Sequence, residues 1–358
     1  MSSIIKADDG VVSGITGITQ TADSSGTLEL QSINGLKLTS GSGIVDASTS
    51  NGGLVPPAGT TAQRPSSPVV GTARWNTTND AYEIWNGVNW YTVTQTSVTL
   101  AFDYLIVAGG GGGNSSNGGG GGAGGFLAGS TSITNSFTVS VGAGGAADTA
   151  GSDSYIASIV AAGGGKGGGT TGLNGGSGGG AGGAYTSVTG GSAVSGQGYN
   201  GGSQTPGASS GCMNYAGGGG GGASAVGGNS YSDPCNNTSY AGSGGNGVSS
   251  SITGAATIYA GGGGGANENN SRPKGSGGTG GGGAGGSTNG SAGTNGTNNL
   301  GGGGGGRNGV GGSGVVIVRY LDTLNDLTSI SSGLIYTQTT LGGYKIYKFT
   351  GGIGTVTI

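Results

Sequence analysis

Short β-prone runs separated by glycine tracts dominate the hydrophobic pattern of this chain. The runs lie before, between and after the tracts, at residues 101–107, 136–141, 155–160, 255–259 and 315–320. No segment repeats apolar positions every three to four residues, which is the pattern of an amphipathic helix. The pattern therefore predicts a fold that is mostly β and irregular, with essentially no α-helix.

The last part of the chain predicts a set of strands that closes the fold. After the strand at 315–320, we expect a loop, a hairpin and a final strand, at 321–332, 334–350 and 355–358. The hairpin turn is expected at Leu341-Gly342-Gly343. We expect these strands to pair with 101–107 and 137–141, and so to clamp both ends of the glycine-rich stretch.

Glycine tracts fill the middle of the chain, and most of its 97 glycines lie between Gly109 and Gly314. Such a composition is typical of a flexible linker, because a glycine backbone loses more entropy on ordering than any other. Two features favour a folded body instead. The tracts recur behind similar lead-ins, such as Val107-Ala108 and Tyr259-Ala260, and β-prone runs interrupt them.

Consecutive glycines can fold as polyproline II helices, which have three residues per turn and no internal hydrogen bonds. Without Cβ atoms, such helices can lie side by side and hydrogen-bond laterally. Ordering a residue costs roughly 1–2 kcal/mol, and a hydrogen bond contributes a net ~0.5–1.5 kcal/mol. The two terms nearly cancel, so we expect burial of the apolar strands to supply the remaining stability. We predict a polyglycine II helix bundle flanked by β-strands in a domain of residues 99–358, with tracts at 109–314 and C-terminal strands at 315–358.

We predict that residues 1–53 are a separate N-terminal attachment and stalk segment. Alternating runs at 27–30 and 35–38 predict short strands. Each strand is too short to bury a core within one chain, so we expect copies of the same chain to cover the apolar stripes. The simplest arrangement is a short-strand trimeric stalk, and the alternative is an unstructured N-terminal tail.

Residues 54–98 predict a small β-meander module that contains all three tryptophans, Trp75, Trp85 and Trp90. Its strands are expected on either side of turns at Thr77–Asp80 and Asn86-Gly87. Tryptophan stacks on sugars, so a carbohydrate platform is one interpretation. The preferred interpretation is that the three rings supply the core of a very small module.

Composition limits the functional classes. The net charge is −3 and the chain has no basic cluster, which argues against a nucleic-acid partner. The sequence contains no run of about twenty apolar residues, so we do not expect it to insert into a membrane. We expect no secretory signal, because Met1–Ile5 leads into the polar residues Lys6, Asp8 and Asp9 without an apolar core. Without histidine, no Ser-His-Asp or Cys-His arrangement can be built, and the carboxylates are sparse. We expect no catalytic site, no cofactor and no metal site.

Cys212 and Cys235 are the two cysteines of the chain. They bracket a polar insert, and either a disulfide between them or two free thiols is compatible with the sequence. A zinc site is not expected, because the chain has neither histidine nor a second cysteine pair.

The small module carries a resemblance to a known family. Gly59-Thr-Thr-Ala-Gln-Arg-Pro65, Gly71-Thr-Ala-Arg-Trp-Asn-Thr77 and Trp85-Asn-Gly87 look like the short module common in bacteriophage tail-fibre proteins. The glycine-rich body is similar to the glycine-rich domain of phage adhesins, in Tyr104-Leu-Ile-Val-Ala-Gly-Gly-Gly-Gly-Gly113 and Gly312-Ser-Gly-Val-Val-Ile-Val-Arg-Tyr320.

The resemblance implies a virion fibre or receptor-binding adhesin, assembled in the host cytoplasm and exposed on the particle. It would be a homotrimer that binds other tail or baseplate proteins through its N-terminus and a host surface polysaccharide or protein through its glycine-rich end. The alternative is a capsid decoration, head fibre or filament-forming surface protein that binds no receptor. An ice-surface binder would require a regular Thr or Ala face, which the sequence does not show.

Polar inserts between the tracts carry aromatic, amide and cationic side chains. Loops on a rigid scaffold concentrate recognition, and Tyr with Ser, Gly and Asn is the chemistry of antibody binding loops. We therefore select these candidate receptor-binding residues: Tyr185, Tyr199, Asn200, Tyr231, Tyr240, Asn267 and Arg272. Tyr215 and Tyr259, which directly precede tracts, are expected to pack in the core instead.

Overall fold

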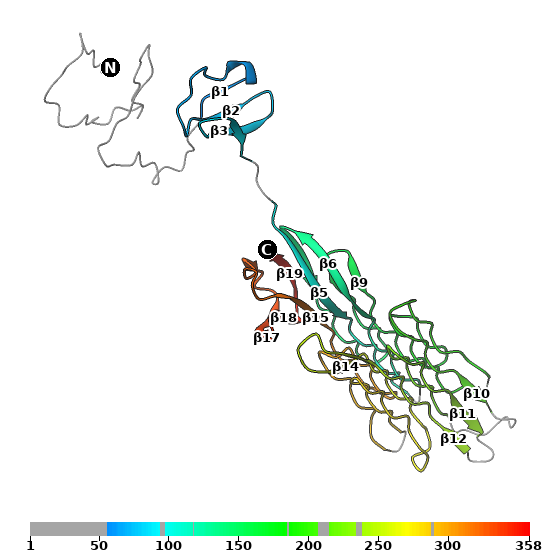
Figure 1. The fold of residues 1–358 in the computed structure, drawn as a ribbon. Coiled ribbons are helices and arrows are strands. Elements are labelled where there is room, and N and C mark those ends of the chain that lie inside the picture. Colours follow the sequence, from blue (N-terminus) through cyan, green and yellow to red (C-terminus); the bar gives the residue numbers. More distant parts are fainter. Residues whose placement is uncertain are drawn as a thin grey trace, which may run out of the picture. The chain divides into compact units, whose positions relative to one another are not determined.

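A computed structural model describes residues 56–93, 97–116, 118–184, 186–206, 215–233, 238–287 and 290–358. The stalk predicted for residues 1–53 lies outside these ranges, as do Tyr185, Cys212 and Cys235. Regular structure in the described ranges is almost entirely β-strand, in several small sheets (Figure 1). The chain divides into two compact units, Met1–Gln95 and Thr96–Ile358.

The first unit holds a four-stranded sheet in the order β1-β2-β3-β4. The elements are β1 (Ala58–Gly59), the 3-10 turn η1 (Thr61–Gln63), β2 (Ala73–Asn76), β3 (Ala81–Trp85) and β4 (Trp90–Thr92). Strands β2 to β4 form the predicted antiparallel meander. Its second turn is held by Asn86, whose Oδ1 accepts hydrogen bonds from the amides of Val88 and Asn89 at 2.9 and 2.8 Å.

The interior of this sheet is charged, which differs from the tryptophan core that the sequence predicts. Trp75 is 37% exposed, and Trp85 and Trp90 are half-buried with their ring centroids 5.7 Å apart, whereas Glu83 is only 1% exposed. Glu83 accepts hydrogen bonds from Arg64 Nη2 at 2.6 Å and Asn76 Nδ2 at 2.9 Å, and Arg74 Nε lies 3.5 Å from its other oxygen. A sheet this small has too little apolar material to enclose large rings, so the enclosed space is occupied by this ionic network.

The stability of the first unit is expected to fall in acid. The hydrogen bond from Arg64 holds the pKa of Glu83 below its ordinary value of 4.5. The carboxylate therefore stabilises the folded chain fully above the unfolded pKa, and this contribution is lost as the pH falls through the lower folded pKa. Because all three tryptophans lie in this unit, tryptophan fluorescence of the full chain during denaturant titrations at neutral and acidic pH measures the effect. A midpoint that does not move with pH would contradict it.

The second unit contains two five-stranded sheets. The first has the order β17-β18-β15-β5-β6, and the second has the order β16-β19-β7-β8-β9. Their strands are β5 (Thr99–Val107), β6 (Phe126–Thr134), β7 (Ser136–Ser140), β8 (Ser154–Ile156), β9 (Ile159–Ala161), β15 (Val315–Leu321), β16 (Ser329–Ile330), β17 (Ile335–Leu341), β18 (Tyr344–Gly351) and β19 (Ile353–Thr357).

The predicted clamp between the two ends of the domain is confirmed. Strand β15 pairs antiparallel with β5, and β19 pairs antiparallel with β7. The β17–β18 hairpin turns at Gly342 and Gly343, whose φ angles of +60° and +83° suit a tight hairpin turn. The run at 155–160 differs from the prediction of one strand, because Ala157 has a φ of +50° and separates β8 from β9.

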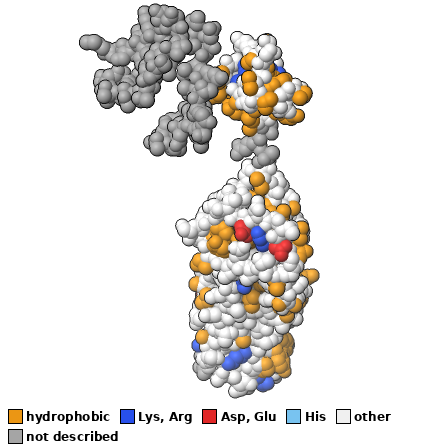
Figure 2. All heavy atoms as spheres, turned by 60° about the vertical axis from the view of Figure 1, so that its left-hand side comes forward, with side chains coloured by type: hydrophobic (Ala, Val, Ile, Leu, Met, Phe, Trp, Pro, Cys, Tyr) orange, Lys and Arg blue, Asp and Glu red, His pale blue; other side chains and the backbone are white. Residues whose placement is uncertain are grey.

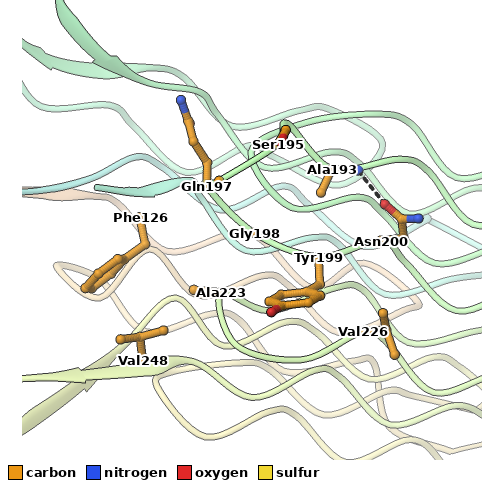
Figure 3. Close-up of a pocket in the computed structure, with 11 residues that line it drawn as sticks. Phe126, Ala193, Ser195, Gln197, Gly198, Tyr199, Asn200, Ala223, Val226 and Val248 are labelled. Carbon is orange, nitrogen blue, oxygen red and sulfur yellow. Dashed lines mark hydrogen bonds between the residues drawn. The ribbon is translucent and has the colours of Figure 1, made fainter. Parts of the chain in front are cut away.

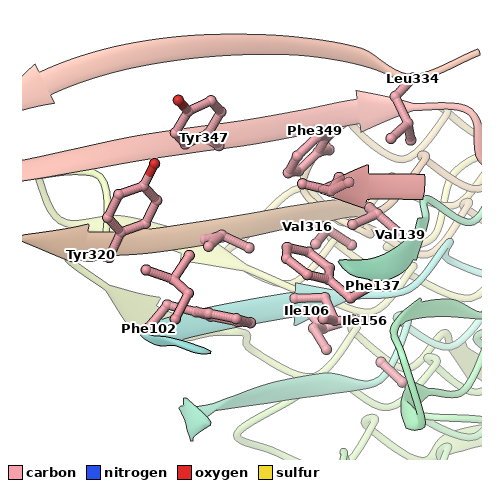
Figure 4. Packing of buried hydrophobic residues seen from close by; sticks show 14 of the residues in the cluster. Phe102, Ile106, Phe137, Val139, Ile156, Val316, Tyr320, Leu334, Tyr347 and Phe349 are labelled. Carbon is pink, nitrogen blue, oxygen red and sulfur yellow. The ribbon is translucent and has the colours of Figure 1, made fainter. Parts of the chain in front are cut away.

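Hydrophobic side chains between the two sheets form one core (Figure 4). The rings of Phe102 and Phe137 lie 5.4 Å apart between their centroids, and those of Tyr320 and Tyr347 stack at 5.9 Å. Strand alternation sends the remaining residues of β5 and β15 to the opposite face of the first sheet. There Leu105, Val107, Val315 and Ile317 pack against Ala123, Ile252, Tyr259 and Ala260 of the glycine-rich body. Both faces of these strands are thus buried, which explains their nearly continuous apolar sequences.

The glycine tracts run beside one another and are bonded laterally (Figure 1). The buried tract at 118–125 shows the pattern of these bonds. Two of its backbone N–H groups that are three residues apart donate to carbonyl oxygens of the same neighbouring segment, at N–O distances of 2.7–3.0 Å. A period of three is that of the polyproline II helix. The donor pairs and their acceptor segments are Gly119 and Gly122 to 165–168, Gly120 and Ala123 to 218–221, and Gly121 and Gly124 to 301–304.

The carbonyls of the same tract accept from three further segments, at 111–114, 177–180 and 263–266. Six neighbours therefore surround this central helix, and every direction around it is occupied by backbone. A Cβ built on Gly121 would lie 2.0 Å from the carbonyl oxygen of Gly111. The tracts consequently form the polyglycine II bundle that the sequence predicts, and glycine is required at positions such as Gly121, where the neighbouring backbones leave no room for a Cβ atom.

Candidate binding surface

Short strands at one end of the glycine-rich body bring two candidate tyrosines together. Strands β10 (Gln204–Pro206), β11 (Ser230–Asp233) and β12 (Thr238–Tyr240) form a sheet there, far from β16–β19 at the other end of the unit (Figure 1). Tyr231 and Tyr240 are direct cross-strand partners, 37% and 50% exposed. They point outward because the alternate positions, Ser230, Ser232 and Ser239, face the glycine body and are small enough to pack on it.

Asn267 does not belong to this exposed surface, although the sequence selects it as a binding residue. Its side chain is fully buried. The Oδ1 atom accepts a hydrogen bond from Ser239 Oγ at 2.9 Å, and Nδ2 donates to the Pro273 carbonyl at 3.0 Å. The residue therefore fastens β12 to the bundle, and a buried amide that is fully engaged is not available to a receptor. Arg272, nearby in the sequence, is partly exposed.

A groove on the body, with a cavity volume of about 540 Å³, contains the candidates Tyr199 and Asn200. Phe126 and Tyr199 lie on either side of Ala223, with Val226 and Val248 completing the apolar wall (Figure 3). Ser195, Gln197 and Asn200 supply uncharged polar groups. None of the residues that line the groove is charged.

The backbone of the groove is fixed by lateral bonds to the bundle. The Tyr199 amide donates to the Gly222 carbonyl at 3.0 Å, and the Tyr199 carbonyl accepts from the Gly178 amide at 3.1 Å. The Tyr199 side chain is nevertheless 48% exposed. A large ring on a fixed backbone loses little further entropy on binding, since only its own side-chain torsions remain to be ordered.

Two amide side chains hold the loop at 193–200 in place. Gln197 bridges to the chain around β9, donating from Nε2 to the Val160 carbonyl at 3.0 Å and accepting at Oε1 from the Ala162 amide at 2.7 Å. The Asn200 Oδ1 accepts from the Ala193 amide at 2.8 Å, and its Nδ2 points away from that bond (Figure 3). The groove is therefore preformed, and Asn200 presents an amide donor at its edge.

A second hollow, of about 490 Å³, contains an ion pair. Arg319 Nη2 lies 2.7 Å from Asp103 Oδ2, and Ser130 Oγ donates to Asp103 Oδ1 at 2.7 Å. These two bonds hold the pKa of Asp103 below its ordinary value. The Arg319 guanidinium also lies 4.6 Å from the centroid of the Tyr344 ring. Because these charges pair with each other, the arrangement stabilises the sheet rather than offering an open charge to a ligand.

Sequence reasoning identified the exposed tyrosines but missed the other wall of the groove. Phe126 begins β6, Val248 begins β13 (Val248–Ser250), and Ala223 and Val226 lie in the irregular segment after the tract at 217–222. Strand β6 itself was not predicted, because its Ser- and Thr-rich sequence has no apolar run. No local pattern indicates that these four residues meet. Tyr259 is 1% exposed, as expected for a core residue.

The described ranges contain no cluster of three or more His, Cys, Asp or Glu side chains that could hold a metal ion. Within those same ranges, no helix has the length and apolar character needed to cross a membrane. Most of the face of the glycine-rich domain in Figure 2 carries neither acidic nor basic side chains. The geometry is suited to binding through ring faces and amide hydrogen bonds, without strong electrostatic attraction.

Comparison with known proteins adds one finding. A protein-family profile described as a glycine-rich domain matches residues 85–321, which is more than half of the chain. No curated protein and no solved structure matches the sequence. The match covers the central bundle, the groove and the Tyr231–Tyr240 sheet.

Proposed function

The chain belongs to the glycine-rich domain family, and from the resemblance of its small module and glycine-rich body to phage fibre proteins we propose that it is a virion structural protein, a bacteriophage tail fibre or adhesin that attaches to the host cell surface. In this proposal the protein is trimeric and non-enzymatic, and it is exposed on the particle after assembly in the host cytoplasm. Its N-terminal segment binds other tail or baseplate proteins, and its glycine-rich domain contacts the host.

The observation that carries this proposal is the display of exposed tyrosines on a laterally bonded glycine scaffold. Tyr199, Tyr231 and Tyr240 are all at least 37% exposed. The bundle around them holds the backbone on several sides, as at Tyr199. A rigid body with aromatic rings exposed on its surface is suited to recognition, because tyrosine provides a large contact area at low entropic cost.

The groove favours uncharged sugar units of a surface polysaccharide as the receptor chemistry. Aromatic rings can stack on the apolar face of a sugar, and amides can hydrogen-bond its hydroxyl groups. Phe126 and Tyr199 provide the rings, and Asn200 provides an amide at the edge. The absence of charge from the lining gives no attraction to an acidic sugar or a charged peptide. Each contact of this kind is weak, so several copies on one particle would raise the affinity by avidity.

Replacing tyrosines on this surface is expected to weaken binding to cells. We expect Tyr199→Ala, and separately the double variant Tyr231→Ala/Tyr240→Ala, to reduce the affinity of the purified full chain for host cells at least about tenfold, since an aromatic contact contributes more than 1 kcal/mol at a binding hot spot. The measurement is flow cytometry of fluorescently labelled protein on a panel of bacterial isolates, with and without competing neutral polysaccharide purified from the bound isolate.

Two matched variants control for loss of folding. Val194→Ala changes an exposed side chain of the same loop that does not line the groove, and Val310→Ala changes one with the same 37% exposure as Tyr231. Both should bind as the unsubstituted chain does. If no isolate is bound and immunogold labels the capsid rather than the tail, the alternative of a decoration or head fibre replaces the adhesin. Binding that protease treatment of the cells abolishes, and neutral polysaccharide does not compete, would identify a protein receptor.

A further inference from the structure

One face of the small sheet in the first unit is apolar along its whole width. In antiparallel strands, directly paired residues share a face. Ile84 of β3 pairs with Ala73 of β2 and with Tyr91 of β4, and Trp75 pairs with Tyr82. We call the surface of these five residues the Trp75 face. Its members Trp75, Ile84 and Tyr91 are 37%, 36% and 57% exposed.

The charged residues of the sheet lie on the opposite face. Arg74 pairs with Glu83 across β2 and β3. Each is adjacent in sequence to a residue of the Trp75 face, so its side chain points to the other side of the sheet. That side is covered by η1 and the following turn, which bring Arg64 onto Glu83. The Trp75 face carries no charged side chain, and hydrophobic side chains cover much of the visible surface of this unit in Figure 2.

The unit has no hydrophobic core of its own in its described part. Within residues 56–93, the buried side chains are those of Arg74, Asn76 and Glu83, and none is hydrophobic. Folded domains of about 40 residues or fewer usually need disulfides, metals or oligomerisation. The two cysteines of the chain lie elsewhere, and residues 56–93 contain no His or Cys to bind zinc. Of these three means, oligomerisation is the one that residues 56–93 leave open to this described part of the unit.

We propose that the Trp75 face is the interface through which copies of this chain associate. A charge-free apolar face is complementary to itself, and symmetric contacts between identical surfaces are the usual basis of homo-oligomers. Packing the faces together removes Trp75, Ile84 and Tyr91 from water and supplies the missing core. This inference specifies a contact surface between copies of the chain, and it holds whether or not the glycine-rich domain binds a host.

The first test is the mass of the full chain in solution, measured by light scattering during size-exclusion chromatography. The unsubstituted protein is expected to elute at a multiple of its 33.2 kDa chain mass. Ile84→Lys places a charge in the centre of the Trp75 face and should raise the protein concentration at which the chains associate. Val88→Lys introduces the same charge at a position that is 73% exposed in the β3–β4 turn, and it should leave the mass unchanged.

A second test does not depend on the folding of a destabilised variant. Tyr91→Cys, treated with a short bis-maleimide, should give a cross-linked two-chain band on a denaturing gel. Val88→Cys, and the unsubstituted chain with its two native cysteines, should give much less. A single-chain mass for the unsubstituted protein at every concentration overturns the proposal. So does equal cross-linking at positions 91 and 88, or an Ile84→Lys variant that associates at the same protein concentrations as the unsubstituted chain. An unsubstituted protein that is oligomeric but binds no host cells would overturn the adhesin instead.

Discussion

Gly121→Ala is expected to destabilise the glycine-rich domain by at least about 3 kcal/mol, the upper end of the range for an overpacked core. The new Cβ would lie 2.0 Å from the carbonyl oxygen of Gly111. That oxygen belongs to the backbone of a neighbouring helix, so no side-chain rotation can relieve the clash. The Gly121 amide also donates to Gly304, and its carbonyl accepts from Gly263, so displacing Gly121 disturbs lateral bonds to two further neighbours.

The matched control for this prediction is Gly169→Ala. Gly169 is an exposed glycine of the same bundle, its nearest contact for a Cβ is the Asn114 side chain at 3.5 Å, and its φ is not positive. We expect a change below about 0.5 kcal/mol, as for an ordinary surface substitution. Ala123 shows that alanine is tolerated in the central tract where space exists, because its methyl group packs against the sheet in a hydrophobic cluster.

Chemical denaturation followed by circular dichroism measures the free energy of unfolding, and hydrogen exchange of residues 109–125 and 261–266 reports the bundle directly. Amides in a laterally bonded bundle should exchange slowly in the unsubstituted chain. They should exchange faster in Gly121→Ala and not in Gly169→Ala. Equal stability of the two alanine variants would show that the tracts are not packed as described.

Glu83→Ala is expected to unfold the first unit, with a loss of about 3 kcal/mol or more. Removal of the carboxylate leaves Arg74, which is 4% exposed, without its charge partner in the interior. Asn76 Nδ2 loses an acceptor at the same time. A unit this small has little stability in reserve, so the loss of one buried ionic partner exceeds what the remaining contacts can offset.

The control for Glu83→Ala is Asp80→Asn. Asp80 is exposed in the β2–β3 turn with a φ of +50°, a conformation that asparagine also adopts readily. Both variants remove one negative charge from the same hairpin, but only Glu83→Ala should shift the tryptophan fluorescence of the full chain to that of the denatured state. The two are compared at one protein concentration, because association of the chains would stabilise this unit. Native-like fluorescence in Glu83→Ala would show that the ionic network is dispensable.

Much of the fold follows from local patterns. The apolar runs at 101–107 and 315–320 correspond to β5 and β15, and the paired glycines at 342 and 343 correspond to a hairpin turn. These features are predictable because strand alternation and turn conformations are properties of a few consecutive residues. Strand β6 was missed because exposed, polar edge strands carry no such signal.

The candidate site was predictable only in part. Tyr199, Tyr231 and Tyr240 are exposed, as aromatic residues in polar inserts suggest. Asn267 resembles them in sequence context, yet Ser239 and Pro273 enclose it. An amide in a polar insert can face solvent or fasten two segments together, and only the positions of those segments in space distinguish the two outcomes.

The sequence alone determined that this chain is built from β-strands and closely packed glycine helices, because a tract without Cβ atoms permits backbones to approach where any other residue would prevent it. The tertiary structure decided which tracts are neighbours, since lateral bonds between identical glycine backbones carry no side-chain code. It also placed Phe126 beside Tyr199, and put Glu83 instead of tryptophan inside the small sheet. These arrangements depend on contacts between residues far apart in the chain, and the local periodicity of a sequence does not encode such contacts.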